Sequence, residues 1–445
     1  MCATTLMSGE SAPRRRSQAR LETQNDIIDV ESLCYGRAGV GRSGGKVVFV
    51  EGTAPGDRVR VRYTRDHGSY AEARVDELVE AGPQRVAPPC PIVDSCGGCP
   101  WQHVDYGAQL EAKRRAVGDA LERIAGIDDA PVAPVVPSPA TLGYRNRLKL
   151  RFDRGRLGFY SAHSHRLVPV PDCLLAEDPI REALPEVEAF VRSLATRVLR
   201  VEIAGRGELP RLILAINSQG RLRRADVHRV RDLLAGSRGR ISGVVMWGRG
   251  WRRTWGDTRR RTVVDSAGTT VESIGAGFGQ VNSAANMLLV DRVVAAARAR
   301  RHETVLDLYA GAGNFSIPLA AHAAHVVAVE SDAELVEAGT RTAQFHRLRN
   351  VEFVAGQVES VLAGPPARRP DLVLVNPPRS GLRAAAPLLA ELGAPRVVYV
   401  SCNPSTLARD LRVLAARGYR LASVVPVDLF PHTFHVESVC DMELT

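Results

Sequence analysis

The sequence predicts an α/β fold, and two observations in its C-terminal third support this prediction. From about residue 275 onward, short apolar runs that suit buried strands alternate with longer segments of helical periodicity. The first apolar run, residues 305–309, leads directly into a glycine turn. Alternating strands and helices joined by such turns are typical of a doubly wound, mostly parallel sheet with helices on both faces.

Seven apolar runs are the expected strands of this sheet. Helical segments separate the earlier runs, as parallel strands require because they need a long crossover connection. The last two runs follow each other more closely, and we expect them to close the sheet as a pair. The runs are residues 305–309, 326–330, 351–355, 372–376, 397–402, about 424–428 and 436–443.

The N-terminal part of the chain has a different pattern. Residues 1–25 are polar and basic, and we expect them to be disordered. Residues 26–82 contain short alternating runs at 27–30, 46–50, 57–63 and 70–77, and the glycine-rich stretches 39–45 and 54–57 between them indicate turns. This predicts a small antiparallel barrel of about five strands, of the OB-like kind that often binds nucleic acid.

The pattern of residues 83–267 predicts a mixed α+β central domain, and residues 268–445 form the predicted doubly wound domain. The central segment opens with a proline-rich connector at 83–91, and a second proline-rich break lies at 131–139. Helices are expected at 107–125, 178–196 and 224–235 because apolar residues recur there at helical spacing. Strands are expected at 148–152, 201–203, 212–216 and 244–247.

Composition and charge point to a polyanionic partner. The chain has 445 residues, a formal net charge of +10 and 45% hydrophobic residues, which suits two or three globular domains. We expect a cytoplasmic protein without a membrane anchor, because no apolar run reaches the length of a membrane helix and the first twenty residues lack a signal sequence.

Arginines are concentrated between residues 145 and 261 and are mixed with aromatic residues. Guanidinium groups beside aromatic rings suit contacts with phosphates and stacking on unpaired bases, which indicates RNA. The alternative is that these arginines only form solvated surfaces. The aromatic residues are Tyr144, Phe159, Tyr160, Trp247, Trp251 and Trp255.

The glycine turn after the first strand of the sheet predicts a nucleoside cofactor. The turn, Asp307 to Asn314, lacks the third glycine of a dinucleotide fingerprint, because Ser316 stands in that place, and no phosphate-loop lysine follows. Glu330 ends the next strand, where an acid accepts hydrogen bonds from ribose hydroxyls. S-adenosylmethionine fits this pattern better than NAD does. The alternative is a tight turn that binds nothing.

A cysteine and a glutamate near the C-terminus form the candidate catalytic pair. Cys402 ends an apolar strand, Asn403 can cap the following helix at 404–417, and Pro404 suits the first helical position. The positive end of that helix is expected to lower the pKa of the thiol below about 8.5. Glu437 lies on an alternating run that should pair into the same sheet. The alternative is a buried cysteine and a surface acid without chemical roles.

Four cysteines are predicted to bind one metal centre. The chain has eight cysteines, but its length and lack of an export signal argue against a disulfide framework. Zinc and a [4Fe-4S] cluster both accept four thiolates, so the spacing alone leaves both possible. Cys2, Cys34 and Cys440 have no evident role. The four candidate ligands are Cys90, Cys96, Cys99 and Cys173.

Five motifs together resemble the RNA uracil-C5 methyltransferases in order and spacing. The resemblance covers about residues 26–445, and the barrel looks like the TRAM domain that many members of this family carry. The motifs are Gly279-Gln280-Val281-Asn282, the Asp307 to Asn314 turn, Asn376-Pro377-Pro378-Arg379-Ser380-Gly381, Ser401-Cys402-Asn403-Pro404 and Phe434-His435-Val436-Glu437.

The resemblance assigns roles to individual residues. It implies that Cys402 is a nucleophile, that Glu437 is a base, and that the four cysteines hold a [4Fe-4S] cluster with a structural or RNA-positioning role. It also implies a Rossmann-like S-adenosylmethionine-dependent methyltransferase domain. Family members usually have aspartate where this chain has Asn376, which removes a negative charge next to the cofactor. The implied cofactor-binding residues are Gln280, Tyr309, Asn314, Glu330 and Asn376.

The expected function is therefore methylation of C5 of a specific uridine in RNA, through a covalent bond between Cys402 and C6. The combination of an iron-sulfur cluster and the barrel favours 23S rRNA as substrate, with transfer RNA as the alternative, and we expect a monomeric enzyme. An amino-group methyltransferase is a second enzymatic reading of Asn376-Pro377-Pro378, but Arg379 stands where such enzymes usually have an aromatic residue. An RNA-binding iron-sulfur protein without turnover is the non-enzymatic alternative.

Overall fold

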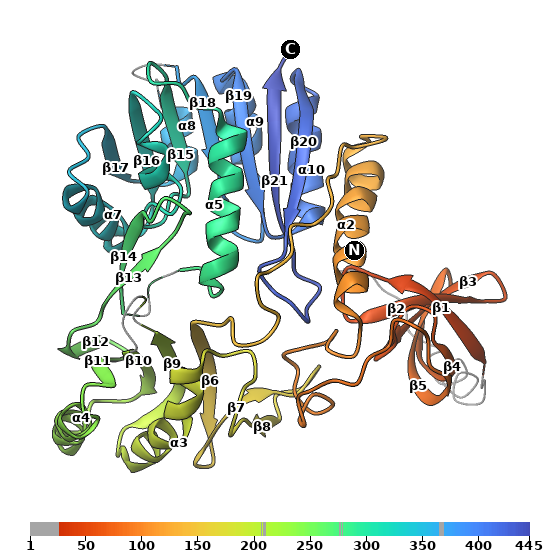
Figure 1. The fold of residues 1–445 in the computed structure, drawn as a ribbon, viewed down its shortest axis with the longest axis horizontal. Coiled ribbons are helices and arrows are strands. Elements are labelled where there is room, and N and C mark those ends of the chain that lie inside the picture. The colour runs from red at the N-terminus through yellow and green to blue at the C-terminus, as the bar shows by residue number, and fades with distance from the viewer. Residues whose placement is uncertain (1–25, 206, 208–210, 276, 278, 365–368) are drawn as a thin grey trace, which may run out of the picture.

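The computed structural model describes residues 26–445 except 206, 208–210, 276, 278 and 365–368. A closed barrel and two seven-stranded sheets make up most of this part of the chain (Figure 1). The barrel lies to the side of helix α2 (Tyr106–Ala120), and the central sheet lies below the C-terminal sheet in this view. The predicted combination of a small barrel, a mixed central part and a doubly wound sheet is confirmed, and the boundaries of the four segments stay predictions.

The barrel has five strands in the order β1-β2-β3-β5-β4. Two expectations were wrong: β3 and β5 pair in parallel, and the glycine-rich stretch 39–45 contains strand β2 rather than only a turn. Gly39 and Gly41 serve close strand packing, because an added Cβ would lie 2.7 Å from Val30 Cγ1 and 2.4 Å from Ile28 Cγ2, respectively. The strands are β1 (Ile27–Leu33), β2 (Ala38–Ser43), β3 (Lys46–Glu51), β4 (Arg58–Asp66) and β5 (Tyr70–Glu80).

The central sheet has the order β12-β11-β10-β9-β6-β7-β8, and helices α3 (Asp178–Ser193) and α4 (Arg224–Gly236) pack against its apolar residues. The expected helices and the longer strands are confirmed. The short strands β7, β8 and β12 were missed because polar residues, glycine and proline weaken their strand pattern. The strands are β6 (Arg147–Asp153), β7 (Arg156–Tyr160), β8 (Leu167–Pro169), β9 (Arg197–Gly205), β10 (Leu212–Gln219), β11 (Ile241–Gly248) and β12 (Trp251–Gly256).

Two segments from the middle of the chain connect the central part to the C-terminal sheet. Helix α2 continues into a π-helical turn, η1 (Leu121–Ala125), and both pack into the core of the C-terminal sheet. The stretch 131–139, expected to be only a break, forms parallel bridges from Val132 to Val424 and from Val136 to Val427. A separate hairpin, β13 (Arg259–Val263) and β14 (Thr270–Ile274), leads into the final domain.

The C-terminal sheet has the order β17-β16-β15-β18-β19-β21-β20, with all neighbours parallel except β21, which is antiparallel to both β19 and β20. All seven predicted strands are present. They are β15 (Thr304–Leu308), β16 (His325–Glu330), β17 (Val351–Ala355), β18 (Leu372–Val375), β19 (Arg396–Ser401), β20 (Tyr419–Val427) and β21 (Glu437–Leu444). The helices are α5 (Ser283–Ala297), α6 (Ser316–Leu319), α7 (Ala333–Phe345), α8 (Val358–Ala363), α9 (Ala385–Leu392) and α10 (Pro404–Ala415).

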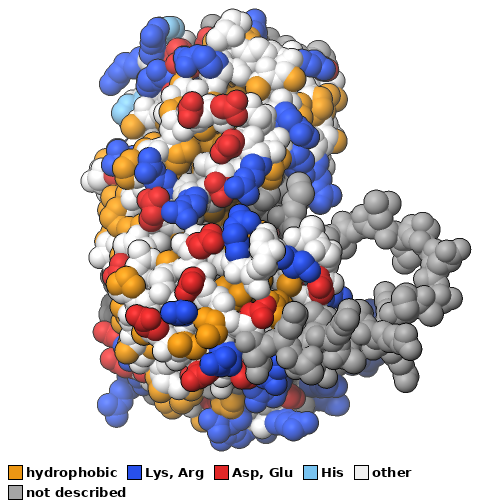
Figure 2. Space-filling model, turned by 90° about the vertical axis from the view of Figure 1, so that its right-hand side faces the viewer, with side chains coloured by type: hydrophobic (Ala, Val, Ile, Leu, Met, Phe, Trp, Pro, Cys, Tyr) orange, Lys and Arg blue, Asp and Glu red, His pale blue; other side chains and the backbone are white. Residues whose placement is uncertain are grey.

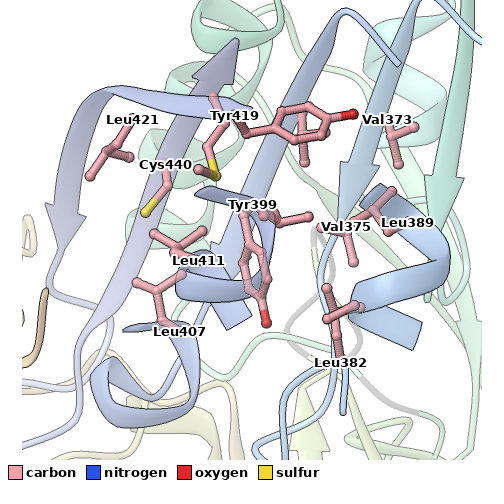
Figure 3. Close-up of a cluster of buried hydrophobic side chains, with 14 of the residues drawn as sticks. Val373, Val375, Leu382, Leu389, Tyr399, Leu407, Leu411, Tyr419, Leu421 and Cys440 are labelled. Atoms are coloured by element: carbon pink, nitrogen blue, oxygen red, sulfur yellow. The ribbon is translucent and has the colours of Figure 1, made fainter. Parts of the chain in front are cut away.

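The core between this sheet and helices α9 and α10 is apolar, and it contains buried tyrosines whose hydroxyls are hydrogen-bonded (Figure 3). Tyr399 is fully buried, and its hydroxyl donates a hydrogen bond to Asp410 Oδ2 at 2.8 Å. Cys440, which had no evident role in the sequence, is a fully buried member of this core. Within the described ranges, no helix has both the length and the apolar character needed to span a bilayer.

Candidate active site

Strand pairing brings Cys402 and Glu437 close together. Ser401, the last residue of β19, pairs with Ser438 of β21 in an antiparallel register. Cys402 directly follows Ser401 and Glu437 directly precedes Ser438, so the two residues adjoin this pair from neighbouring strands, and the Glu437 charge acts on the Cys402 thiol. The sequence predicted that both residues join the same sheet, and the structure brings them together.

The surroundings of Cys402 correct one expectation about its thiol. Helix α10 begins as predicted, with Asn403 accepting a hydrogen bond from the backbone N–H of Ser405 at 3.1 Å and Pro404 in the first turn. However, burial and the nearby Glu437 raise the pKa of the Cys402 thiol to about 11. The cost of removing a thiolate from water therefore exceeds the effect of the helix terminus.

Arg379 is the cation that opposes this shift. Its charge and a hydrogen bond to the Cys402 side chain both act to lower the pKa of the thiol. The Arg379 carbonyl accepts hydrogen bonds from Asn403 Nδ2 at 3.4 Å and Thr406 Oγ1 at 3.2 Å, so the first turn of α10 fixes the backbone at this arginine. The following turn needs Gly381, which has φ +72° and whose added Cβ would lie 2.4 Å from Asp410 Oδ2.

Glu437 is a buried acid with an unusually high pKa. Its side chain lies in the interior, and burial raises the pKa of this carboxyl to about 8, while the charge of Arg379 acts in the opposite direction. A carboxyl with this pKa exchanges a proton close to neutral pH, which suits a general base.

Aromatic side chains from three parts of the chain form one wall of the site. The Tyr35 and Phe434 rings meet edge to face with centroids 5.5 Å apart, and Trp101 lies 6.5 Å from Phe434. His435 stacks at a tilt on Phe434, and its pKa is lowered to about 4 by burial and neighbouring cations, so it is neutral at physiological pH. Sequence reasoning missed Tyr35, which is far from every motif that signals chemistry, and Trp101, which lies two residues after Cys99 but far in sequence from the catalytic motifs.

The loop that carries Phe434, residues 428–436, is fixed by helix α2. Lys113 and Asp428 form a fully buried ion pair with 2.6 Å between Nζ and Oδ1, and Lys113 Nζ also donates to the Phe430 carbonyl at 3.1 Å. Gln109 Oε1 accepts from the His432 N–H at 2.8 Å. The segment that follows the clustered cysteines therefore determines the path of the chain toward Glu437.

The predicted cofactor residues lie mainly along the carboxyl edge of the C-terminal sheet. Tyr309, Glu330 and Asn376 stand at or just after the ends of β15, β16 and β18, the edge at which doubly wound sheets bind ligands. Cys402 follows β19 at the same edge. Gln280 precedes α5, and its carbonyl accepts from Asn146 Nδ2 at 3.0 Å.

The glycine turn is held open toward this edge. Glu330 Oε2 accepts from the Gly311 N–H at 3.0 Å, and Oε1 accepts from the Asp332 N–H at 2.9 Å. An added Cβ at Gly311 would have no neighbour within 4 Å, which leaves room for a ligand against the backbone. Asn314 is oriented by a reciprocal pair of hydrogen bonds with Asn286, at 2.9 and 3.1 Å. The Ser331 hydroxyl also donates to Oε1 at 3.1 Å, so Glu330 is oriented with a lone pair of Oε2 left for a further donor.

The four clustered cysteines line one cavity of about 220 Å³. No three His, Cys, Asp or Glu side chains converge on a single metal ion anywhere in the part of the chain that the structure describes. The cavity is nevertheless far larger than one ion, and burial raises the pKa of the Cys96, Cys99 and Cys173 thiols, with the other thiolates adding to the shift. Arg145 also lines the cavity, and its buried Nε has no hydrogen-bond partner. These features fit a polynuclear, anionic group.

The predicted RNA-binding stretch of arginine and aromatic residues is only partly on the surface. Arg147 and Arg260 are buried, and Arg147 pairs with Glu202, with 3.0 Å from Nε to Oε1. Tyr160 is exposed, and the Arg151 guanidinium lies 5.1 Å from its ring centroid. Figure 2 shows one side of the molecule, where basic side chains are spread from the upper to the lower end and acidic ones lie among them.

Comparison with known proteins identifies the family. Residues 259–443 match the family described as tRNA (Uracil-5-)-methyltransferase, and residues 24–75 match the TRAM domain. The chain is 33% identical to the 23S rRNA (uracil(1939)-C(5))-methyltransferase RlmD of Hahella chejuensis, covering 96% of this chain and 99% of that protein. The chain belongs to the RNA uracil-C5 methyltransferase family. Like its relatives, this methyltransferase depends on S-adenosylmethionine, and the predicted family, barrel and methyltransferase fold are confirmed.

Two further relatives support the assignment over the whole length of the methyltransferase. The RlmD protein of Pectobacterium atrosepticum is 34% identical over 96% of this chain and 96% of its own. The crystal structure of Pyrococcus abyssi tRNA (uracil-54, C5)-methyltransferase in complex with S-adenosyl-L-homocysteine superimposes with a TM-score of 0.72 at 25% identity, covering 94% of this chain and all of that one. These similarities favour uracil-C5 chemistry over the amino-group and non-enzymatic alternatives.

Proposed function

We propose that this methyltransferase modifies C5 of a uridine in RNA through a covalent bond between Cys402 and C6 of the base, with Glu437 as the general base. The observation that supports the proposal is the pairing of Ser401 with Ser438, next to which Cys402 and Glu437 stand on adjacent strands. The proposed cofactor residues Tyr309, Glu330 and Asn376 stand at the same edge of the sheet, which supports a shared site.

The chemistry explains why a thiol and a carboxylate are both needed. C5 of uracil is a weak nucleophile, and addition of the Cys402 thiolate to C6 produces an enolate that is electron-rich at C5. S-adenosylmethionine supplies an electrophilic methyl group when bound. Glu437 then takes the C5 proton, the electrons of the broken C–H bond restore the C5–C6 double bond, and the Cys402 thiolate is eliminated.

The pKa values of Glu437 and Cys402 suit different roles in the reaction. Glu437 has a pKa of about 8, so its carboxylate is a stronger base than an ordinary glutamate and is still populated near neutral pH. Cys402 has a pKa of about 11 and depends on Arg379 to stabilise its thiolate. We assign Arg379 this role of keeping the nucleophile reactive.

We assign cofactor binding to Gln280, Tyr309, Asn314, Glu330 and Asn376. The carboxylate of Glu330, oriented by the backbone of Gly311 and Asp332, accepts hydrogen bonds from the ribose hydroxyls. Asn376 follows β18 beside β15, where its N–H donates to the Leu308 carbonyl at 3.2 Å, and its amide offers hydrogen bonds without a charge.

We propose 23S rRNA as the substrate. The support is that two relatives matching almost the whole chain are named as 23S rRNA methyltransferases. Transfer RNA is the second candidate, because the matching family description and the Pyrococcus abyssi structure both name tRNA. Mapping 5-methyluridine in both RNAs from a strain that lacks the gene decides between them: loss of one 23S rRNA site is expected, and loss confined to tRNA would overturn the choice.

We propose that Cys90, Cys96, Cys99 and Cys173 hold a [4Fe-4S] cluster, and that Arg145 balances its negative charge. The shared cavity and the unpartnered Nε of Arg145 support this over four free thiols. The cluster would anchor the segment around the cysteines and take no part in methyl transfer. Protein purified without oxygen should be brown, absorb near 400 nm and contain about four irons per chain; stoichiometric zinc in colourless protein would contradict the proposal.

We also propose that the methyltransferase acts as a monomer in the cytoplasm, where its RNA substrate is. The support is that Cys402 and the proposed cofactor residues Tyr309, Glu330 and Asn376 stand along one edge of a single sheet, so the site does not require a second subunit. Light scattering after gel filtration should give the mass of a single chain, and a stable dimer would overturn this part of the proposal.

The covalent step is tested with RNA that carries 5-fluorouridine at the target position. Fluorine at C5 replaces the proton that the base removes and cannot leave as a cation, so the adduct through Cys402 should accumulate and survive a denaturing gel. Cys402→Ala should form none. Cys440→Ala, on β21 but buried in the core, is the matched control and should form the adduct normally. Absence of an adduct with the unaltered enzyme and S-adenosylmethionine would refute the mechanism.

A further inference from the structure

The loop between β1 and β2 of the TRAM barrel reaches the catalytic cysteine. Tyr35, in this loop, donates a hydrogen bond from its hydroxyl to the backbone carbonyl of Cys402 at 3.2 Å, although the two residues are 367 positions apart. The same ring meets the Phe434 ring edge to face. The N-terminal barrel therefore contributes a side chain to the wall beside the nucleophile.

The loop is held in place from the side of the clustered cysteines. Arg37 Nη1 donates to the Gly97 carbonyl at 3.0 Å, in the turn between Cys96 and Cys99. Within the loop, the Cys34 N–H donates to the Ala38 carbonyl at 3.1 Å. Tyr35 thus lies on a loop that is held between the cysteine turn and Phe434. Its hydrogen bond to the Cys402 carbonyl is therefore part of a fixed arrangement and not a chance contact at the surface.

The position of the hydrogen bond explains what Tyr35 could control. The Cys402 carbonyl lies immediately before Asn403, the N-cap of helix α10. Fixing the peptide plane of Cys402 fixes the direction of its Cα–Cβ bond and so the approach of the sulfur to a base. Burial and the charges of Cys402 and Glu437 raise the pKa of the Tyr35 phenol, so it keeps its proton and remains a donor.

We propose that Tyr35 is a positioning residue for methyl transfer, through which the TRAM barrel sets the orientation of Cys402 and of Phe434. This inference deepens the proposed function, since it concerns the same covalent step. It assigns the barrel a part in the chemistry in addition to any contact it makes with RNA.

Two substitutions separate the contributions of the hydroxyl and the ring. Tyr35→Phe removes only the hydrogen bond to the Cys402 carbonyl, and Tyr35→Ala also removes the contact with Phe434. At saturating 5-fluorouridine RNA, we expect the adduct to form about fivefold more slowly with Tyr35→Phe, the effect of one typical hydrogen bond, and roughly thirtyfold more slowly with Tyr35→Ala. The dissociation constant for RNA should stay within about twofold of the unaltered value.

Tyr70→Phe is the matched control, because Tyr70 lies in the same barrel and packs against Phe49 and His67, away from the catalytic pair. It should leave the adduct rate unchanged. If Tyr35→Ala fails to fold, as its melting temperature would show, Tyr35→Phe still tests the proposal. Unchanged adduct rates in Tyr35→Phe, or a change confined to RNA affinity, would overturn it.

A second measurement is independent of RNA and of the cofactor. The alkylation rate of Cys402 by iodoacetamide, followed by peptide mass spectrometry between pH 7 and 10, reports how accessible and how acidic the thiol is. We expect the pH profile of Cys402 to shift in Tyr35→Phe but not in Tyr70→Phe. An unchanged profile together with an unchanged adduct rate rejects a role for Tyr35, whereas failure of the unaltered enzyme to form any adduct rejects the covalent mechanism instead.

Discussion

The cofactor-binding edge and the catalytic pair lie on the same sheet but are assembled in different ways. The cofactor edge consists of turns that directly follow neighbouring strands, and Glu330 is oriented by the backbone of Gly311 and Asp332. The catalytic pair depends on distant segments: Tyr35 of the barrel contacts Cys402, and Lys113 of helix α2 fixes the loop that leads to Glu437. Substitutions of Tyr35 or Lys113 should therefore impair catalysis and spare cofactor binding.

The largest expected effect is that of removing the base. Glu437→Gln should lower the methylation rate about a thousandfold, because general bases contribute about 10²–10⁴-fold. The variant should accumulate a methylated adduct with ordinary uridine RNA, since the amide that replaces the carboxylate cannot take the C5 proton. Its affinity for S-adenosylmethionine, measured by calorimetry, should stay within about twofold, because the cofactor edge is built separately. Normal turnover by this variant would remove Glu437 from the mechanism.

Breaking the buried ion pair should have the next largest effect. Lys113→Met leaves Asp428 as an unpaired buried charge, a change that costs about 3–5 kcal/mol of unfolding free energy. The 428–436 loop should then lose its fixed path, so the rate of adduct formation should fall together with stability. Urea unfolding and the 5-fluorouridine assay measure the two effects.

The control for this substitution is an ion pair of the same chemistry on the surface. Lys46→Met breaks the contact with Asp66, 2.8 Å from Nζ to Oδ1, in the barrel, where both side chains are accessible to water. It should cost less than about 1 kcal/mol and leave the adduct rate unchanged. If Lys113→Met also weakened S-adenosylmethionine binding strongly, the two regions would not be independent.

The sequence could predict the features that depend on local patterns, and it could not predict those that depend on contacts between distant segments. The strands of the C-terminal sheet, the cap at Asn403 and the position of Glu330 follow from local patterns, and the structure has them where expected. Tyr35 and Lys113 were missed because their partners lie 367 and 315 positions away, and a lysine in an amphipathic helix normally indicates a solvated face. The pKa of Cys402 was predicted in the wrong direction because the sequence shows the start of helix α10 but does not show how far the folded chain removes the thiol from water.

The high pKa of Glu437 predicts a cost in stability. In the unfolded chain this carboxyl ionises near its ordinary pKa of 4.5, whereas in the folded chain it ionises near 8. The unfolded state therefore binds fewer protons between these values, so stability should fall as pH rises from about 4.5 to about 8. Glu437→Gln lacks this titration, and its melting temperature should exceed that of the unaltered enzyme at pH 8.5 but not at pH 4.5. A constant difference across this range would contradict a buried, titrating carboxyl.

The smallest expected effect is that of a substitution at the cofactor-binding edge, which should weaken cofactor binding without changing the catalytic pair. Glu330→Gln replaces one carboxylate oxygen by an NH₂ group, which would face the N–H donors of Gly311 or Asp332 and cannot accept from ribose. The affinity for S-adenosylmethionine should fall about tenfold, equivalent to about 1.4 kcal/mol. Glu334→Gln, an exposed neighbour on α7 that pairs with Arg252, should leave this affinity unchanged.

The deciding measurement for Glu330→Gln is the alkylation rate of Cys402 without RNA or cofactor. Because Glu330 makes none of the contacts that orient Cys402, the pH profile of this reaction should match that of the unaltered enzyme. Tyr35→Phe should show the opposite result, with altered alkylation and unchanged cofactor affinity. If both variants altered both quantities, the cofactor edge and the catalytic pair would behave as one cooperative unit, and the separation drawn from their contacts would be wrong.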